Sequence, residues 1–215
     1  MKETRLNMSM PSDGSKPANT PRNSSHQPLS PKRDPHSTSD VQEGRWSTRR
    51  IAIYALFVAL SIVASFIELP LFPAAPYLKY DPSGIVSLIS GFAFGPMAAV
   101  LVSILSWVPH LFTDPYGTLM AVAVALSLSV PASLVYRRVH TRKGALLGII
   151  VGSVSALAVA IIGNLIITPL YANISVSAVA TMILPVLLPF NLMKLAIHGV
   201  VTFLIYKPIS MLVHR

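Results

Sequence analysis

Three polar side chains interrupt long apolar stretches in the second half of the chain and could carry chemistry there. Lys194 and Asn191 lie three residues apart within one stretch, and Asn164 follows Gly163 near the end of another. A spacing of three places Lys194 and Asn191 on one face of a helix. An ionised group inside a membrane span is costly, so we expect Lys194 to face a cavity, a partner or a ligand. Snorkelling of Lys194 to the membrane interface, and a helix–helix hydrogen bond for Asn164, are the alternatives.

A second candidate region is the segment of residues 68–82, which combines four prolines with the aromatic residues Phe72, Tyr77 and Tyr80. Proline fixes φ, so the segment is expected to be stiff. A stiff aromatic segment suits a lid over a planar apolar ligand, and Trp107 is a further candidate for stacking on a ring. An interfacial aromatic belt would give the same composition without any ligand. The nearby His110 fits an interfacial hydrogen bond better than a metal site.

The motifs of common catalytic sites are absent from the sequence. It contains no HExxH, GxSxG or GxxxxGK[ST] motif and no cysteine, and five of its eight carboxylates precede residue 46. We therefore predict no catalytic residue, no metal site, no bound cofactor and no enzyme activity. A secondary transporter or a membrane enzyme is a low-ranked alternative, because Lys194 is the only ionisable group deep in an apolar run.

The elements that must position these residues are indicated by composition. Of 215 residues, 53% are apolar and only 12% are charged, which is too few charges to cover a water-soluble surface. Residues 1–45 differ from the rest, because they are rich in Ser, Pro and mixed charge and have no apolar periodicity. We predict a disordered polar cytoplasmic tail over residues 1–45 and an all-α integral membrane domain over residues 46–215.

Six apolar runs predict six membrane helices, of which the second is too short to cross a bilayer alone. A short segment survives at membrane depth only when it is buried in protein or lines a cavity. Pro109 and Pro131 predict kinks in the third and fourth runs, and Thr168-Pro169 is expected to stop the fifth. The runs are Ile51–Ile67, Ser83–Phe94, Met97–Phe112, Thr118–Tyr136, Ala145–Ile167 and Val186–Tyr206.

The distribution of basic residues supports the even count. With six spans, one side of the membrane carries most of the arginines, and the positive-inside rule then places both termini in the cytoplasm. Omitting the second run would place the cluster between the fourth and fifth runs outside the cell, against that rule. The residues on the basic side are Arg45, Arg49, Arg50, Arg137, Arg138, Arg142, Lys143, Lys207 and Arg215.

Several local sequences, taken together, resemble a known family. They are YLKYD at residues 77–81, GFAFGP at 91–96 and LPFNLMK at 188–194, and they follow a first run in which Ala55 and Ala59 form a small-xxx-small pair. Over residues 49–207 the chain resembles the substrate-binding S component of an energy-coupling factor (ECF) vitamin transporter. The riboflavin-specific subgroup is the most similar. The PFNxxK element is the most specific part of the match.

The resemblance implies a six-helix subunit that captures riboflavin at the extracellular face. Uptake would be driven by ATP hydrolysis in a separate module of one transmembrane coupling protein and two ATPases. It also implies that Ala55 and Ala59 contact the coupling protein. The substrate-binding residues that it implies are Leu78, Lys79, Asp81, Asn164, Asn191 and Lys194.

The chain also departs from the riboflavin-specific pattern at two places. Ser106 and Trp107 stand where members often carry Lys-Asn, and residues 120–123 read MAVA where an Asn-Phe pair is common. Both departures remove polar groups, so an S component for a different vitamin or precursor is the main alternative.

Overall fold

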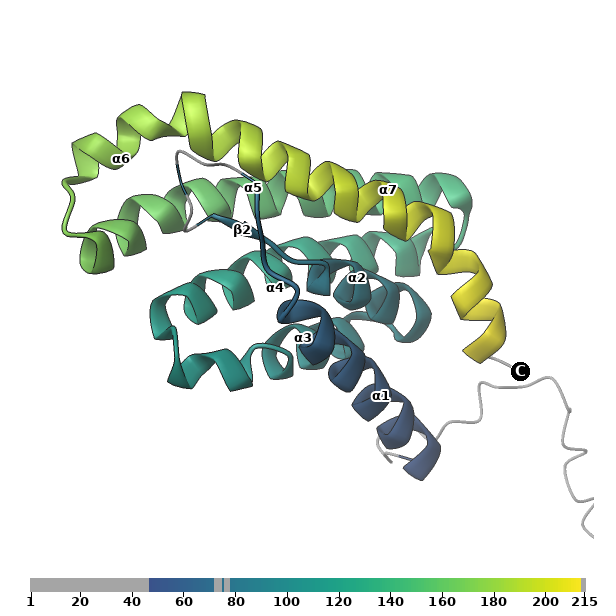
Figure 1. Cartoon of the computed structure of the whole chain (residues 1–215). Helices are drawn as coiled ribbons and strands as arrows, with labels where there is room; N and C mark the ends of the chain where they lie inside the picture. Colours follow the sequence, from purple (N-terminus) through teal and green to yellow (C-terminus); the bar gives the residue numbers. More distant parts are fainter. Residues whose placement is uncertain (1–46, 72–74, 76–77, 214–215) are drawn as a thin grey trace, which may run out of the picture. The chain divides into compact units, whose positions relative to one another are not determined.

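The helical membrane architecture expected from the apolar runs is confirmed in the computed structural model, which describes residues 47–71, 75 and 78–213. In this part of the chain, four helices are long and apolar enough to cross a membrane, and two shorter apolar helices accompany them. The predicted tail over residues 1–45 lies outside the described residues. The elements in chain order (Figure 1) are α1 (Thr48–Ser65), β1 (Leu69–Pro70), β2 (Lys79–Tyr80), α2 (Ser83–Phe94), α3 (Pro96–Leu105), the 3₁₀ helix η1 (Val108–Phe112), α4 (Pro115–Arg138), α5 (Arg142–Ala172), α6 (Val176–Met182), the π-helical turn η2 (Ile183–Leu187) and α7 (Leu188–Val213).

Side-chain caps set where the long helices begin. Ser47 accepts a hydrogen bond from the backbone N–H of Arg50 at the start of α1, at 3.3 Å. Asp114 and Thr141 cap α4 and α5 in the same way, at 2.8 and 3.1 Å. Each cap satisfies a backbone donor that the first turn of a helix leaves unpaired. These boundaries are therefore encoded locally, in residues just before each apolar run.

The short helix α2 is buried on nearly all sides, as expected for a helix too short to cross a bilayer alone. It contacts α1, α3, α4 and α7, and nine of its twelve residues are buried. Its position inside the bundle explains how a helix too short to cross a bilayer is accommodated at membrane depth.

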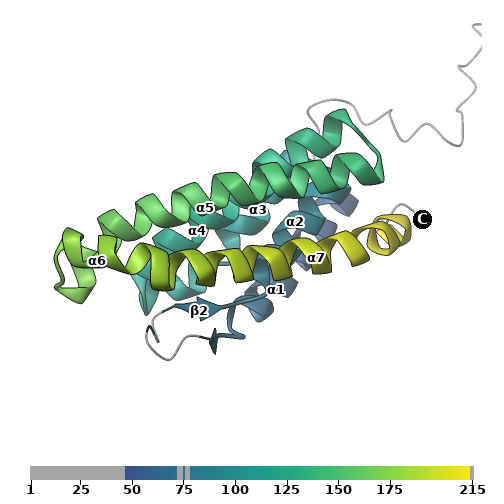
Figure 2. The same ribbon diagram turned by 90° about the horizontal axis from the view of Figure 1, so that it is seen from above.

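Helices α4 and α5 form a closely packed antiparallel pair, which both views show side by side (Figures 1 and 2). Gly148 and Gly152 make this approach possible. A Cβ on either glycine would lie 2.6 or 2.2 Å from the backbone oxygen of Ala132 or Leu128. The pair thereby forms one wall of the bundle, and residues of both helices line the cavity described below.

Two predicted helix boundaries near prolines were wrong, and one predicted kink is a break between two helices. Helix α5 continues through Pro169 to Ala172, because a proline in a membrane helix costs little where neighbouring groups satisfy the freed backbone. The third run is divided rather than kinked, since α3 ends at Leu105 and Pro109 lies in η1. The last helical segment begins at Val176, about ten residues before the predicted start at Val186. The reason is that α6, η2 and α7 are continuous around Pro185.

A short hairpin was not foreseen from the sequence. Strands β1 and β2 pair antiparallel, with Leu69 opposite Tyr80 and Pro70 opposite Lys79. Below the hairpin, Ala75 and Leu78 pack with Val179, Leu187 and Phe190 of α6, η2 and α7. The segment expected to act as a stiff lid is thus attached at both of its described ends, while Phe72 and Tyr77 lie outside the described residues.

Candidate substrate-binding site

A cavity of about 330 Å³ opens between α4, α5, α7 and the β2–α2 connection. We refer to it as the Asp81 cavity. Its volume lies at the lower end of the range typical of small-molecule sites. All six residues expected to bind a substrate line it, namely Leu78, Lys79, Asp81, Asn164, Asn191 and Lys194. Three separate parts of the chain, namely the β2 region, α5 and α7, therefore deliver the polar groups that the sequence singled out to one place.

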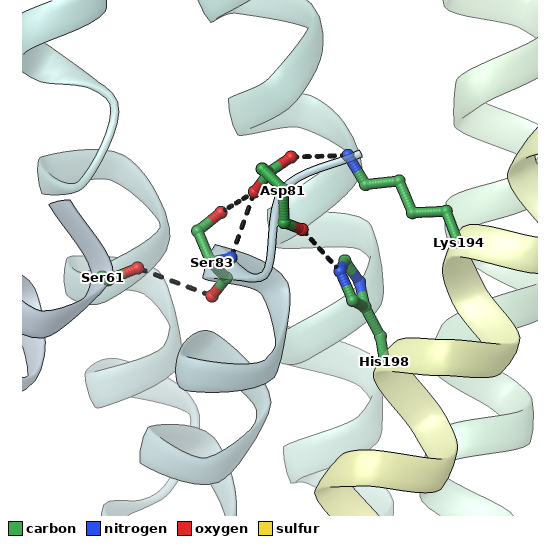
Figure 3. A network of polar contacts seen from close by, with 5 residues as sticks. All are labelled: Ser61, Asp81, Ser83, Lys194 and His198. Carbon is green, nitrogen blue, oxygen red and sulfur yellow. Dashed lines mark hydrogen bonds and ion pairs between the residues drawn. The ribbon is translucent and has the colours of Figure 1, made fainter. Parts of the chain in front are cut away.

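Lys194 lines the cavity and forms an ion pair within the protein. Its Nζ donates to Oδ2 of Asp81 at 2.7 Å, and the two side chains are only 17% and 5% exposed (Figure 3). The ion pair argues against snorkelling of Lys194 to the membrane interface, because it holds the ammonium group inside the bundle. The partner was not identified from the sequence, since Asp81 and Lys194 are 113 residues apart.

Asp81 is the centre of a polar network that joins three elements (Figure 3). Its carboxylate accepts hydrogen bonds from the backbone N–H of Ser83, at 3.1 Å, and from the Ser83 hydroxyl. Its backbone oxygen lies 2.8 Å from Nε2 of His198. Ser61 of α1 donates to the backbone oxygen of Ser83 at 3.5 Å. The network ties the end of the hairpin to α7 and to the start of α2.

The ionisation of Asp81 follows from this network. Burial opposes the charged form and would raise the pKa of Asp81, but the charge of Lys194 and the hydrogen bonds from Lys194 and Ser83 outweigh it. The pKa therefore lies below the ordinary carboxyl value. Asp81 is thus a carboxylate in the resting protein and neutralises Lys194.

The two asparagines are oriented by their own helices. Nδ2 of Asn164 donates to the Ala160 oxygen at 2.8 Å, and Thr168 donates to Oδ1 of Asn164 at 3.0 Å. Nδ2 of Asn191 donates to the oxygen of Leu187, the last residue of the π-helical turn, at 2.8 Å. An amide nitrogen carries two hydrogens, so each asparagine keeps a donor to offer the cavity.

Aromatic residues surround the cavity. Trp107 lines it as expected, and so do Tyr116 and Tyr171, whose rings stack with centroids 6.1 Å apart. Tyr80 does not line the cavity. Successive residues of a strand point to opposite faces, so Lys79 faces the cavity while the Tyr80 ring packs against His198 at 5.5 Å. Tyr80 thus lies outside the lining of the cavity, and its role as a ring-stacking or lid residue stays a prediction.

Two kinds of site residue escaped the sequence analysis. His198 is fully enclosed and lines the Asp81 cavity, four residues after Lys194 on the same helical face, so the spacing could have revealed it. Tyr116 and Tyr171 had no local signal, because they meet only when α4 and α5 pack. His110 does not line the cavity but lies buried between the rings of Phe66 and Trp107. Among the described residues no group of three potential ligands could hold a metal ion.

The two alanines assigned to a partner contact lie on the outside of the bundle. Ala55 and Ala59 are exposed on α1, whereas Tyr54, Phe57 and Ser61 form the buried face of the same helix. The exposed strip around the alanines carries the large apolar residues Leu56, Leu60 and Val63. A second helix could therefore approach α1 closely along this face.

Comparison with known proteins gives a consistent result. The family described as "ECF transporter, substrate-specific component" matches residues 49–206. Riboflavin transporter RibU of Staphylococcus aureus is 26% identical over 176 residues, which are 78% of this chain and 93% of that protein. Riboflavin transporter FmnP of Bacillus subtilis is 23% identical over 172 residues, 74% of this chain and 90% of that protein. A solved structure described as the S component of a bacterial ECF transporter is similar with a TM-score of 0.67 and 25% identity, over 78% of this chain and 98% of that one.

Proposed function

Because the chain belongs to the family of substrate-specific components of ECF transporters, we propose that it captures riboflavin at the extracellular face of the membrane. Membership of the family makes it a multi-pass membrane subunit of a vitamin transporter that works with a coupling module, and not an enzyme. Riboflavin as the cargo is the finer step, and it rests on the Asp81 cavity together with the riboflavin transporters among the relatives.

The observation that carries the proposal is the convergence of fixed polar groups in a largely apolar cavity. Asn164, Asn191 and the ion pair of Asp81 with Lys194 face one space of about 330 Å³. Riboflavin has a planar tricyclic ring with an imide edge and two carbonyls. Asparagine amides can pair with such an edge, and lysine can donate to a carbonyl. Trp107, Tyr116 and Tyr171 supply aromatic surface for the ring.

The charge of the cavity favours the neutral vitamin over a phosphorylated flavin. Both lysines that line it are paired, Lys79 with Glu68 and Lys194 with Asp81. A third carboxylate, Asp114, also lines the cavity. A phosphate would therefore meet no uncompensated lysine there.

The alternative of a different vitamin or precursor is supported by the cavity wall on α4. Met120 and Ala121 line the cavity within residues 120–123, the segment where an Asn-Phe pair is common in the riboflavin-specific pattern. Ser106 is buried, and its hydroxyl donates to the backbone oxygen of Ser103. At Met120 and Ala121 the wall therefore offers a ligand its shape and no free side-chain hydrogen-bonding group, and the hydroxyl of Ser106 is already paired.

The coupling partners form the second half of the proposal. One transmembrane coupling protein would dock on the exposed Ala55 and Ala59 strip of α1, and two ATPases would supply the energy. Both termini, including the tail of residues 1–45, would lie in the cytoplasm, because Arg50 and Arg137 gather at the bundle end opposite the Asp81 cavity.

The test is the absorption spectrum of the protein purified in detergent from cells grown with riboflavin. We expect a yellow flavin signal of about one per chain, lost in Asn191→Ala and in Lys194→Ala. Lys143→Ala is the matched control, because Lys143 is exposed at the start of α5 and lies outside the cavity. A colourless protein that also fails to quench added riboflavin fluorescence would refute riboflavin as cargo and leave the other-vitamin alternative.

A further inference from the structure

A second cavity, of about 380 Å³, lies at the other end of α4. We call it the arginine cavity. Its rim carries Arg50 from α1, Arg137 from α4 and His140, and its wall includes Phe92, Tyr136 and the α2–α3 turn at Gly95. Tyr116 of the Asp81 cavity and Tyr136 are twenty residues apart on α4, which is about 30 Å along a helix. The two cavities therefore lie at opposite faces of a bilayer-sized bundle.

The positive charge of the arginine cavity is not compensated within the described part of the chain. Glu68, Asp81 and Asp114 are the only Asp and Glu residues after residue 45 in the sequence, and all three line the Asp81 cavity instead. Arg50 is held by a neutral partner, since its Nε donates to the Tyr54 hydroxyl at 3.0 Å. Its guanidinium carbon lies 5.7 Å from the centre of the Tyr54 ring. This contact fixes the position of the guanidinium without neutralising it.

Backbone dipoles add to the same field. Helix α3 begins at the cavity with Pro96, and no side chain caps its N-terminus. Gly95 holds a positive φ of 88°, and a Cβ there would meet nothing within 4 Å, so the turn leaves open space in front of the helix end. The N-terminus of a helix favours negative charge. It therefore reinforces the two arginines, which by themselves already define the site.

An ordinary role for each basic residue does not account for their convergence. Arg137 is in the last turn of α4, where it complements the helix dipole, and basic residues generally flank membrane spans. Neither effect requires Arg50 and Arg137, which are 87 positions apart in the chain, to share one concave space. Nor does either require the ring of Phe92 to pack on Tyr136, at 4.7 Å, and Tyr136 to pack on His140, at 5.5 Å.

We infer that the arginine cavity binds a phosphate-type anion that carries an apolar group. The guanidinium groups of Arg50 and Arg137 would grip the phosphate through paired N–H donors, and the ring of His140 would add another. The aromatic wall of Phe92 and Tyr136 would contact the apolar part. An anionic phospholipid headgroup and a soluble phosphorylated molecule share this chemistry. The site is separate from the Asp81 cavity and does not depend on the identity of the cargo.

The experiment uses the full chain, purified and stripped of lipid in a neutral detergent. Short-chain phosphatidylglycerol and phosphatidylcholine with the same acyl chains are titrated separately, and the unfolding temperature and the native mass spectrum are recorded. Inorganic phosphate is then added as a competitor. The test variant is Arg50→Gln/Arg137→Gln. The matched control is Arg142→Gln/Lys143→Gln, which removes the same charge from exposed positions outside the cavity.

We expect phosphatidylglycerol to raise the unfolding temperature and phosphatidylcholine to have no comparable effect. Affinity for phosphatidylglycerol should fall at least tenfold in Arg50→Gln/Arg137→Gln and stay unchanged in the control. Competition by inorganic phosphate would support the site and assign it to soluble phosphorylated ligands, while its failure to compete would assign it to lipid headgroups. Equal responses to the two lipids, or equal losses in both variants, would overturn the proposal. If the test variant does not fold, the wild-type comparison of the two lipids decides.

Discussion

The Asp81 cavity and the arginine cavity lie at opposite ends of α4 and treat charge in opposite ways. In the Asp81 cavity each lysine has a carboxylate partner, one buried and one exposed. The arginine cavity has two arginines and no carboxylate among the residues that the structure describes. One site is therefore close to electrically balanced before any ligand arrives, and the other is not.

This difference decides what each site can select. A buried charge without a partner is costly, so a cavity that supplies its own counter-charge gains nothing from a charged ligand and can select by shape and hydrogen bonds. Lys194, Asp81 and the two asparagines form such a pre-satisfied site. A cavity with open positive charge attracts an anion instead.

Removing the counter-charge of Lys194 should destabilise the protein most. Asp81→Asn leaves an uncompensated ammonium group inside the bundle and weakens the hydrogen bonds to Ser83. Breaking one side of a buried ion pair costs about 3–5 kcal/mol. The free energy of unfolding, measured by thermal denaturation in detergent, should fall by about that amount.

Two further variants separate this effect from surface electrostatics. Asp81→Asn/Lys194→Met should recover much of the stability, because neither partner is then left charged and buried. Glu68→Gln breaks the exposed pair with Lys79, whose side chain is 49% exposed, and should cost less than about 1 kcal/mol. Equal losses for Asp81→Asn and Glu68→Gln would show that the buried pair is not special.

The sequence was sufficient for what depends on local composition. Apolar runs indicated the helices, and the cost of burying Lys194 pointed to a cavity. The ends of helices at Pro169 and Pro185 were mispredicted, because proline is a strong helix breaker in water but a weak one within a packed membrane bundle. Local rules calibrated on soluble helices therefore place membrane helix ends too early or too late.

The partners within the site could not be predicted, because they are set by packing. Nothing near Asp81 in the chain indicates that it meets Lys194, or that its backbone oxygen meets His198. The stacked pair of Tyr116 and Tyr171 depends on the close approach of α4 and α5 along Gly148 and Gly152. The sequence could identify candidate site residues from the cost of burying them. Which of these residues contact one another could be known only from the folded structure.

The balanced charge of the Asp81 cavity predicts discrimination against phosphate. If riboflavin is the cargo, flavin mononucleotide should bind at least about tenfold more weakly, which corresponds to about 1.4 kcal/mol. Glu68→Gln releases Lys79 from its partner and should narrow this gap. Fluorescence quenching titrations with both flavins measure it, and Arg142→Gln, far from the cavity, should leave it unchanged. Equal affinities in the wild-type protein would contradict the idea that the cavity is already neutralised.

The smallest effect is expected from pH, because Asp81 stays ionised over the whole neutral range. Its pKa in the folded protein lies below the ordinary value of 3.8. The folded state therefore binds fewer protons than the unfolded state near that value, so the contribution of Asp81 to stability is complete above it and is lost as pH falls further.

The contribution of Asp81 to the unfolding temperature should accordingly stay constant between about pH 8 and pH 5. It should disappear only below about pH 4. Other carboxylates titrate in the same range, so the informative quantity is the difference between the wild type and Asp81→Asn at each pH. That difference should shrink on acidification, because protonated Asp81 and Asn are both uncharged and both leave Lys194 without a counter-charge. A difference that grew towards low pH would mean that the pKa of Asp81 is raised in the folded protein, so that its desolvation outweighs the charge of Lys194.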